Sequence, residues 1–381
     1  MIKFQSKARI FISDELCPPI IEILTQEGAK SVLAVIDSNI AQHEEVQLLH
    51  GTLSEGYSLV WEKMIAKEPT TDMVNDFTEK YRSNSFDMVI AVGGGSILDF
   101  TKVVSAMLVN PGKVEDYHGT GKQLPRAIKK IMVPTTAGTG SEATAAGVLI
   151  NTHTHFKRGV VGPHVTPDYA VLNAKLIMKM PDHILASTGM DAMAHAVESY
   201  AAVNANVITR MYAKQAFSLI VNSLKKIFSD RSNYKNYEDL MLGSCLAGYA
   251  ITNSNTGAAH GMSYALGIYK GVPHGVGVGT LLPHVLQINM EKGCSIYGEL
   301  LDCIEEIKDT SGTKEEKTKM FVEYIQNYEP LKKIPALRTY NIAKEEINFL
   351  ADKGFDFAVA FKGNPVDFTV EDSIKSLNKA W

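Results

Sequence analysis

Asp191 and His195 stand four residues apart in a run of good helix formers that extends from Gly189 to Glu198. Residues at i and i+4 share one face of a helix, so this carboxylate and this imidazole could bind a single cation. Taken alone, such a pair is more often an ordinary ion pair or a capped surface turn. The spacing therefore raises a metal site as a hypothesis that needs further ligands.

Two histidines further along the chain could complete the site. His260 and His274 each stand among small, apolar and glycine-rich neighbours that offer an imidazole few hydrogen-bond partners. A buried imidazole without a partner is costly, so something must satisfy it. One carboxylate oxygen and three imidazoles suit Fe(II), Zn(II), Co(II) or Ni(II) better than Mg(II) or Ca(II), which prefer oxygen ligands. The predicted metal ligands are Asp191, His195, His260 and His274.

The elements that must position these side chains fall into two halves. In the first half, helical patterns alternate with short apolar runs at 31–37, 86–92 and 131–134. This alternation is typical of a mostly parallel sheet with helices on both faces. From Pro181 onward strand-like runs nearly vanish, and apolar residues recur at helical spacing over 187–203, 209–228, 237–252 and 295–308. We therefore predict an N-terminal α/β domain over residues 1–180 and an all-α C-terminal domain over 181–381.

Two glycine-rich segments follow predicted strands of the first half. Gly93-Gly94-Gly95-Ser96 precedes a helical run over 97–109, so backbone N–H groups at a helix N-terminus could face an anion there. This is not the G-x-G-x-x-G fingerprint, and a glycine cluster can be only a tight turn. The segment 134–142 adds hydroxyls and two more glycines after the next strand. Since ligands of open parallel sheets bind beyond the carboxyl ends of the strands, we expect a dinucleotide pyrophosphate at these segments.

Asp37 stands at the end of an early predicted strand, where a ribose 2′-hydroxyl would be recognised. A carboxylate there should repel a 2′-phosphate, which favours NAD over NADP. The competing interpretation is a simple turn residue before Ser38 and Asn39, and it explains the residue nearly as well.

The composition bounds the class of protein. The chain has 381 residues, of which 45% are hydrophobic and 21% charged, and its formal net charge is -4. Such a chain suits a two-domain globular protein without a general attraction for nucleic acid or anionic lipid. Four scattered cysteines without a C-x-x-C pair argue against a disulfide framework or a thiolate zinc site. Because no apolar leader or membrane span is visible, we expect a soluble, cytoplasmic protein with no nucleic-acid or membrane partner.

Taken together, these motifs resemble the iron-containing, or group III, alcohol dehydrogenase family through nearly the whole chain. The segments that carry the resemblance are Gly93–Ser96 with Asp99 and Lys102, Pro134–Glu142, Gly189–Asp191 with His195 and Glu198, His260–Met262, Pro273–Gly275, Leu282–His284 and Asn364–Pro365. The resemblance implies an N-terminal dinucleotide-binding α/β domain and a helical metal-binding domain, an architecture shared with dehydroquinate synthase. It also implies a homodimer that holds Fe(II). Zn(II) tolerates the same ligands and is the alternative, and the carboxylate of Asp37 favours NAD over NADP.

Carried over residue by residue, the resemblance assigns the metal ligands already named. It also places cofactor neighbours at Gly94, Gly95, Ser96, Asp99, Thr135, Thr136, Thr139 and Thr144. Lys157 matches a lysine that contacts the nicotinamide ribose in relatives. Two positions depart from the family pattern. Relatives usually carry a second, non-ligand histidine near the substrate, and this chain has Tyr264 at that position. Tyr264 is therefore the candidate catalytic residue. At the second position Asn173 replaces an Asp that is common in the family, and we have no physical account of this replacement.

The predicted activity is the interconversion of a small primary alcohol and its aldehyde, with the enzyme acting as an aldehyde reductase. Basic residues at 153–158 and His164 could receive an anionic aldehyde such as phosphonoacetaldehyde, although a solvated hairpin explains them better. One rival is a zinc enzyme similar to glycerol dehydrogenase or dehydroquinate synthase. A rival of another class is a non-catalytic protein that binds metal or nucleotide, which the Tyr264 substitution favours.

Overall fold

The structure is a computed structural model that describes residues 4–154 and 156–381, apart from the side chains of residues 357 and 358. The chain forms two compact units. The α/β unit comprises Ser6–Thr136 and Gly140–Lys179. The helical unit comprises Met180–Trp381 together with Ala137–Thr139 and residues 4–5. The short segment Ala137–Thr139 thus belongs with the helices although it lies within the first half of the sequence.

A six-stranded sheet forms the centre of the α/β unit. Its strands are β1 (Arg9–Ile12), β2 (Ser31–Asp37), β3 (Ser58–Met64), β4 (Met88–Gly93), β5 (Lys129–Pro134) and β8 (Tyr169–Leu172). They are ordered β1-β8-β5-β4-β2-β3, and every neighbouring pair is parallel. The predicted parallel sheet is confirmed, and the three strands expected from apolar runs are its central members β2, β4 and β5.

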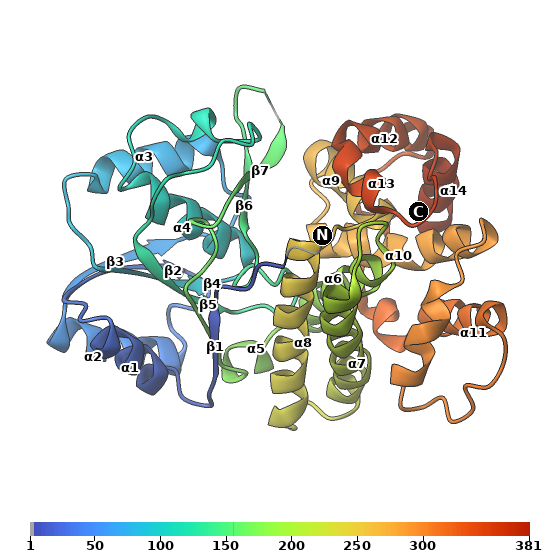
Figure 1. Cartoon of the computed structure of the whole chain (residues 1–381), viewed down its shortest axis with the longest axis horizontal. Coiled ribbons are helices and arrows are strands. Elements are labelled where there is room, and N and C mark those ends of the chain that lie inside the picture. Colours follow the sequence, from blue (N-terminus) through green and yellow to red (C-terminus); the bar gives the residue numbers. More distant parts are fainter. Residues whose placement is uncertain (1–3, 155) are drawn as a thin grey trace. The chain divides into compact units, whose positions relative to one another are not determined.

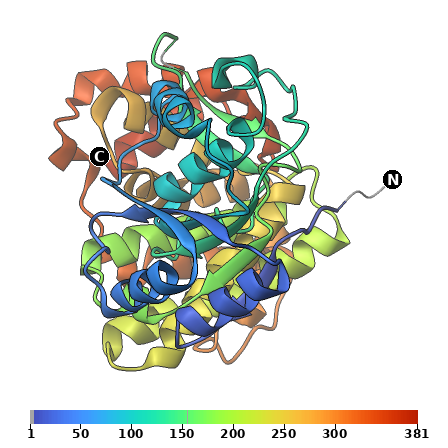
Figure 2. The ribbon, with the colours of Figure 1, turned by 90° about the vertical axis from the view of Figure 1, so that its left-hand side faces the viewer.

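Helices cover both faces of this sheet, as Figures 1 and 2 show. They are α1 (Cys17–Gln26), α2 (Glu44–Gly56), α3 (Thr71–Tyr81), α4 (Gly95–Met107) and α5 (Lys175–Met178). Alternate residues of a strand point to opposite faces, so Leu33 and Val35 of β2 join the core beneath α3 and α4. Their neighbours Val32 and Ala34 join the core beneath α1 and α2. Burial on both faces explains why β2 reads as one continuous apolar run.

An antiparallel hairpin completes the α/β unit. It consists of β6 (Ala146–Ile150) and β7 (Lys157–Val161), with Ala146 opposite Val161 and Ile150 opposite Lys157. A short 3-10 turn, η1 (Val114–Asp116), follows α4. The basic residues Lys157 and Arg158 thus begin the second strand of a hairpin, the setting that the sequence analysis gave as the better explanation of this segment.

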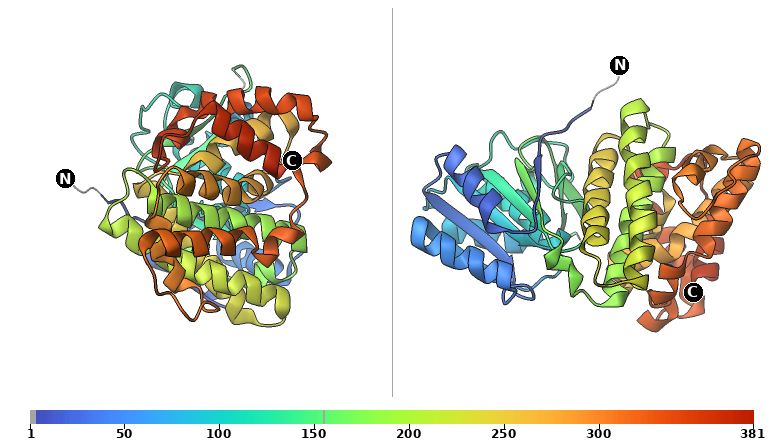
Figure 3. Two further views of the ribbon diagram at one scale, coloured as in Figure 1. Left: turned by 90° about the vertical axis from the view of Figure 1, so that its right-hand side faces the viewer. Right: turned by 90° about the horizontal axis from the view of Figure 1, so that it is seen from below.

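Residues 181–381 contain helices and no strand. The α-helices are α6 (Asp182–Ala201), α7 (Val207–Ser229), α8 (Tyr234–Asn253), α9 (Ala258–Lys270), α10 (His274–Glu291), α11 (Lys314–Gln326), α12 (Ile347–Gly354), α13 (Ala358–Gly363) and α14 (Val370–Ala380). The 3-10 helices are η2 (Ile296–Cys303), η3 (Glu329–Lys333), η4 (Leu337–Tyr340), η5 (Lys344–Glu346) and η6 (Phe355–Phe357). Helix α6 packs against α7, α8 and α10, and Figure 3 shows the helices of this unit from two further sides. The all-α C-terminal region is confirmed.

One expected helix differs in kind and length. Apolar spacing over 295–308 predicted an α-helix, but the chain forms the 3-10 helix η2 and leaves that geometry after Cys303. Packing against α11 constrains the backbone of this segment, because a Cβ at Gly298 would lie 2.8 Å from Lys317 Cβ and 2.9 Å from the Lys314 carbonyl oxygen of α11. Close approach to α11 therefore overrides the helix type that the local apolar spacing predicted.

Among the described residues, none of the helices has both the length and the apolar character that crossing a membrane requires.

Candidate metal centre

Helix α6 carries the first two predicted ligands. Asp191 and His195 lie one turn apart on it, and both are buried, with 2% and 5% of their surfaces exposed. Gly189 lets this part of α6 approach α7, because a Cβ there would lie 2.7 Å from the Leu224 side chain. In the segment Gly189–Asp191 the glycine therefore allows close helix packing and the aspartate provides a predicted metal ligand.

The N-terminal turns of two further helices supply His260 and His274. His260 is the third residue of α9 and is 1% exposed, whereas His274 is the first residue of α10 and is partly exposed. Gly275 brings the start of α10 against α6, since a Cβ at this position would lie only 2.6 Å from the Ser187 carbonyl oxygen. A residue with a side chain after His274 would push the ligand away from Asp191.

Three of the four predicted ligands form one close cluster, and the fourth, His274, reaches Asp191. Ligand atoms of Asp191, His195 and His260 all lie within 4.8 Å of one another. His260 Nε2 is 3.5 Å and His274 Nε2 is 3.8 Å from Asp191 Oδ1. Residues up to 83 positions apart are thus gathered around one carboxylate oxygen, as the sequence interpretation required.

Each imidazole uses its Nδ1 atom for a hydrogen bond to the protein. His195 Nδ1 lies 3.2 Å from the Gly138 carbonyl oxygen, which can only accept, so Nδ1 carries the proton. His260 Nδ1 lies 2.5 Å from the acceptor carboxylate of Glu198. Ser263 donates its hydroxyl to the His274 carbonyl oxygen at 3.0 Å, which leaves the Ser263 oxygen to accept from His274 Nδ1 at 3.2 Å. With Nδ1 engaged in all three residues, Nε2 is the nitrogen through which each of them would bind a cation.

The charges of the cluster attract positive charge. Burial alone would raise the pKa of Asp191, but the neighbouring His195, His274 and His260 outweigh it and hold the pKa below its usual range. Burial lowers the pKa of His195. Burial also acts to lower the pKa of His260, yet the flanking carboxylates Glu198 and Asp191 raise it to about 9. The buried carboxylates on either side of His260 therefore attract positive charge to this cluster.

Two atoms at the centre of the cluster test whether a metal fits. Among the described residues, Asp191 Oδ1 and His260 Nε2 are buried and have no hydrogen-bond partner. Buried polar atoms are rarely left in this state, and these two are the atoms on which a cation would be coordinated. The donor set of one carboxylate oxygen and three imidazole nitrogens suits Fe(II) or Zn(II). The residues therefore fit the group that the sequence predicts.

Tyr264, the candidate catalytic residue, lies one helical turn after His260 on α9. Its ring stacks on the His274 imidazole, with centroids 5.4 Å apart and planes at 18°. The stacking places the aromatic ring beside a predicted ligand and restricts the rotation of that ligand.

The two glycine-rich segments lie side by side in the α/β unit. Strands β4 and β5 pair with Gly93 opposite Pro134, and Thr135 donates its backbone N–H to the Gly93 carbonyl oxygen at 3.0 Å. Gly94 is the N-cap of α4, and a Cβ there would lie 3.3 Å from Thr136 Cγ2. The first N–H groups of α4 thus lie at the carboxyl edge of the sheet, as anion binding at a helix N-terminus requires.

Other predicted cofactor residues have contacts within the α/β unit. Asp37 is buried at the end of β2, and its Oδ1 accepts the Asn39 backbone N–H at 2.9 Å. One carboxylate oxygen of Asp37 therefore stabilises the turn, as the competing interpretation of this residue expected. Asp99 accepts from Ser141 Oγ and from the Val148 backbone N–H, and it pairs with Lys102 at 2.9 Å. Both Asp99 oxygens are therefore engaged in joining α4 to the segment 141–148.

Thr144 and Lys157 also have protein partners. The fully buried Lys102 donates to Thr144 Oγ1 at 3.0 Å, which ties the hydroxyl to the same network as Asp99. Lys157 forms an ion pair with Glu68 at 2.8 Å. Gly95 and Ser96 begin α4 and are partly exposed, and Thr139 lies in the short segment that belongs with the helical unit.

The basic segment considered for anion binding is partly committed to the protein. Arg158 lies over the Phe156 ring, with its guanidinium carbon 5.1 Å from the ring centroid. His164 uses its carbonyl oxygen to accept from the buried Lys130 at 2.9 Å. His155 lies outside the described residues.

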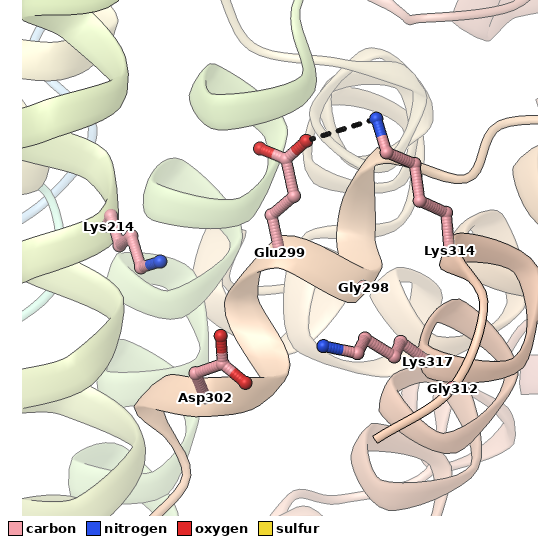
Figure 4. Close-up of a pocket in the computed structure, with 7 residues that line it drawn as sticks. All are labelled: Lys214, Gly298, Glu299, Asp302, Gly312, Lys314 and Lys317. Atoms are coloured by element: carbon pink, nitrogen blue, oxygen red, sulfur yellow. Dashed lines mark ion pairs between the residues drawn. The ribbon is translucent and has the colours of Figure 1, made fainter. Parts of the chain in front are cut away.

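A separate pocket of about 290 Å³ opens in the helical unit and contains none of the predicted ligands (Figure 4). Its walls combine charges of both signs, and Lys314 Nζ lies 4.0 Å from Glu299 Oε1. The lining residues are Lys214, Gly298, Glu299, Asp302, Gly312, Lys314 and Lys317. Mixed charges exposed to solvent do not define a ligand, so the pocket adds nothing to the site.

The α/β unit has a parallel sheet with the N-terminus of α4 at its carboxyl edge, and the helical unit brings an Asp and three His together. Family profiles match both halves of the chain. The iron-containing alcohol dehydrogenase profile matches residues 8–174, and the profile of the C-terminal region of the Fe-containing alcohol dehydrogenase family matches residues 185–381. The chain belongs to the iron-containing alcohol dehydrogenase family.

Individual relatives are similar along most of their length. Long-chain-alcohol dehydrogenase 1 of Geobacillus thermodenitrificans is 34% identical over 277 residues, which cover 72% of this chain and 69% of that protein. The crystal structure of a 1,3-propanediol oxidoreductase is 27% identical, covers all of both chains and has a TM-score of 0.92. A sulfoacetaldehyde reductase from Bifidobacterium kashiwanohense, solved in complex with NAD+, is 25% identical over 100% of this chain and 98% of its own, with a TM-score of 0.87.

Sequence reasoning missed the groups that orient the ligands. The roles of Glu198, Ser263 and the Gly138 carbonyl oxygen emerge only from the three-dimensional contacts. For Glu198 a signal was present, because it follows Asp191 by seven residues and so shares its helical face. Every residue has a backbone carbonyl, so the sequence could not indicate that the carbonyl oxygen of Gly138 would accept a hydrogen bond from a predicted ligand.

Proposed function

We propose that the protein interconverts a small primary alcohol and its aldehyde with NAD(H), and that it works as an aldehyde reductase. Three observations support the proposal: membership of the iron-containing alcohol dehydrogenase family, the donor cluster in the helical unit, and the anion-binding geometry at α4. The observation that carries it is the pair of unpartnered buried atoms, Asp191 Oδ1 and His260 Nε2, among the described residues.

In this proposal Asp191, His195, His260 and His274 would hold the cation. When bound, a divalent cation supplies Lewis acidity toward the substrate oxygen, and NAD(H) supplies or accepts the hydride. Reduction of the aldehyde then consumes NADH and one proton and yields the alcohol and NAD+. Tyr264 is the candidate group near the substrate, where its phenol would position the alcohol or pass the proton.

For the dinucleotide, we propose binding at the carboxyl edge of the parallel sheet. The backbone N–H groups of Gly95 and Ser96 would receive the pyrophosphate, with Thr135 and Thr136 beside them. Asp37 would accept the ribose hydroxyl and disfavour NADP. Asp99, Thr144 and Lys157 would support this site through the partners described above.

Elemental analysis of anaerobically purified protein, combined with absorbance at 340 nm, tests the proposal. The protein should contain one transition metal per chain and oxidise NADH when supplied with Fe(II) or Zn(II) and a small aldehyde. Saturable metal or nucleotide binding without oxidation of NADH across a panel of aldehydes would favour the non-catalytic binding protein instead. Metal analysis of cell-derived protein decides between iron and the zinc of glycerol-dehydrogenase-like enzymes.

An anionic aldehyde is a second candidate substrate. The similarity to a sulfoacetaldehyde reductase favours it, because sulfoacetaldehyde carries a negative charge. The contacts of Lys157 with Glu68 and of Arg158 with Phe156 use part of the basic segment within the protein. If the candidate is right, kcat/KM for phosphonoacetaldehyde exceeds that for a neutral aldehyde of equal length, and equal values would remove it. A homodimer in the cytoplasm stays our prediction for the assembly and its location.

A further inference from the structure

Glu198 is a buried carboxylate at the edge of the predicted metal centre. It is 4% exposed and lies on α6, two turns after Asp191 and one turn after His195. Three donors point at it: His260 Nδ1 at 2.5 Å, the Gly257 backbone N–H at 2.8 Å and the Ala259 backbone N–H at 3.0 Å. One face of α6 therefore carries two predicted ligands and the group that holds a third.

The backbone around the carboxylate is shaped to let it approach. Gly257 is the N-cap of α9, and a Cβ there would lie 2.9 Å from Glu198 Oε1. The absence of a side chain lets the carboxylate reach the first N–H groups of α9, where a negative charge is stabilised by the helix dipole. Glu198 thus joins the N-terminus of α9 to α6 and contacts the imidazole in the same step.

We propose that Glu198 is a positioning residue that holds the proton of His260 on Nδ1 and directs Nε2 at the metal. The inference rests on the proposed function, because it requires that a metal bind here. A carboxylate can only accept, so His260 must donate from Nδ1, and its Nε2 is left 3.5 Å from Asp191 Oδ1. The Nδ1 atoms of His195 and His274 meet a carbonyl and a hydroxyl oxygen, whereas Nδ1 of His260 meets a carboxylate, and a charged acceptor makes the stronger hydrogen bond.

The isosteric substitution Glu198→Gln cannot keep all three contacts. If the amide nitrogen replaces Oε2, it meets the Gly257 N–H and forces His260 Nδ1 to accept, which moves the ring proton to Nε2. If it replaces Oε1, it meets the Ala259 N–H instead. In either orientation one donor loses its acceptor, and in the first the imidazole is in the wrong tautomer for coordination through Nε2.

A purely structural role would be to anchor α9, and Asn364 provides the matched control. Its Oδ1 atom accepts the Ala258 N–H of the same helical turn at 3.4 Å, and its amide pairs with Asn289. Asn364 is 3% exposed, so it resembles Glu198 in burial. It has no hydrogen bond to His260 among those of the described residues, so Asn364→Ala removes a helix anchor without touching the imidazole.

The test measures the Zn(II) dissociation constant of the metal-free protein by competition with a chromophoric chelator. Glu198→Gln should weaken Zn(II) binding by about 10- to 100-fold, the usual effect of losing a group that orients a ligand. Asn364→Ala should change the constant by less than about three-fold while lowering the thermal stability of the metal-free protein. Equal losses in both variants, or an unchanged constant in Glu198→Gln, would overturn the inference.

Two further outcomes are distinguishable. If the unaltered protein binds no Zn(II), the metal centre itself fails, whereas normal binding by the unaltered protein and by Glu198→Gln removes only the role of Glu198. If Glu198→Gln does not fold, long-range 1H–15N spectra of the 15N-histidine-labelled, Zn(II)-loaded protein decide. A ring proton on Nδ1 of His260 supports the role, and a ring proton on Nε2 refutes it.

Discussion

The Tyr264 ring stacks on the His274 imidazole with centroids 5.4 Å apart, so the residue that departs from the family pattern lies directly against a predicted metal ligand. An aromatic pair of this kind contributes about 0.5–1.5 kcal/mol beyond the area it buries. The Tyr264 ring therefore supports a predicted ligand, separately from any chemical role of its hydroxyl, and substitutions can distinguish the two.

Substitutions at Tyr264 separate the ring from the hydroxyl. Tyr264→Ala should weaken metal binding by roughly 2- to 13-fold, the equivalent of the lost ring pair. Tyr264→Phe keeps the ring and should keep the metal affinity, while kcat falls about 100-fold if the phenol transfers a proton. Metal titration and steady-state kinetics on the two variants check this. Full activity in Tyr264→Phe would exclude the hydroxyl from the chemistry.

Removal of a ligand should remove metal and activity together. In His260→Ala or His274→Ala, metal content should drop and kcat/KM should fall by about 100-fold or more, because several kcal/mol of transition-state stabilisation depend on the cation. His183→Ala is the control, since His183 is an exposed residue of α6, the helix that carries Asp191 and His195. A fully active, metal-free ligand variant would refute the assignment.

The contact between Gly275 and α6 predicts a packing effect on the site. Gly275→Ala places a Cβ 2.6 Å from the Ser187 carbonyl oxygen, so it should destabilise the protein by about 1–3 kcal/mol and weaken metal binding through His274. In Gly267→Ala the new Cβ lies 3.5 Å from the Val272 carbonyl oxygen, which is an ordinary contact. Urea unfolding and metal titration compare the variants. Equal stability of Gly275→Ala and Gly267→Ala would show that the contact with Ser187 does not constrain α10.

Asp37→Asn tests the choice of dinucleotide. The amide oxygen can still accept the Asn39 N–H, so the turn is retained while the charge is removed. The ratio of kcat/KM for NADPH to that for NADH should rise roughly five-fold, which matches about 1 kcal/mol for two unit charges 4 Å apart in water. An unchanged ratio would leave Asp37 as a turn residue only.

Stability should fall in mild acid because of His284 on α10. Burial, with a smaller effect of Lys379, lowers the pKa of His284 from its ordinary value of 6.5 to about 4. Between these values the unfolded chain takes up the proton first, so this contribution to stability is present above pH 6.5 and is lost as the pH falls toward 4. As the pH falls over this range, the melting temperature of the metal-free, unaltered protein should decrease more steeply than that of the metal-free His284→Asn variant. Parallel curves would contradict the prediction.

Local patterns identified the class of architecture and the strands β2, β4 and β5, but not the other strands of the α/β unit. The continuous apolar runs of β2, β4 and β5 identified buried parallel strands because both faces of such strands are covered, and the helical spacing after Pro181 identified the bundle. Spacing also selected Asp191 and His195, since i and i+4 share a helical face whatever the rest of the chain does. Where packing between distant helices competes with local spacing, as at η2, the same rules predicted the wrong kind of helix.

The sequence by itself determined which side chains could bind a metal and in what order they occur, because donor chemistry belongs to residue type. Only the tertiary structure decided that His260 and His274 lie within 4 Å of Asp191 Oδ1, since that depends on how α6, α9 and α10 pack. It also decided the partners of each Nδ1, which include a backbone carbonyl and a carboxylate from other segments. Hydrogen bonds between segments remote in sequence carry no local pattern, so the orientation of the ligands is a property of the fold.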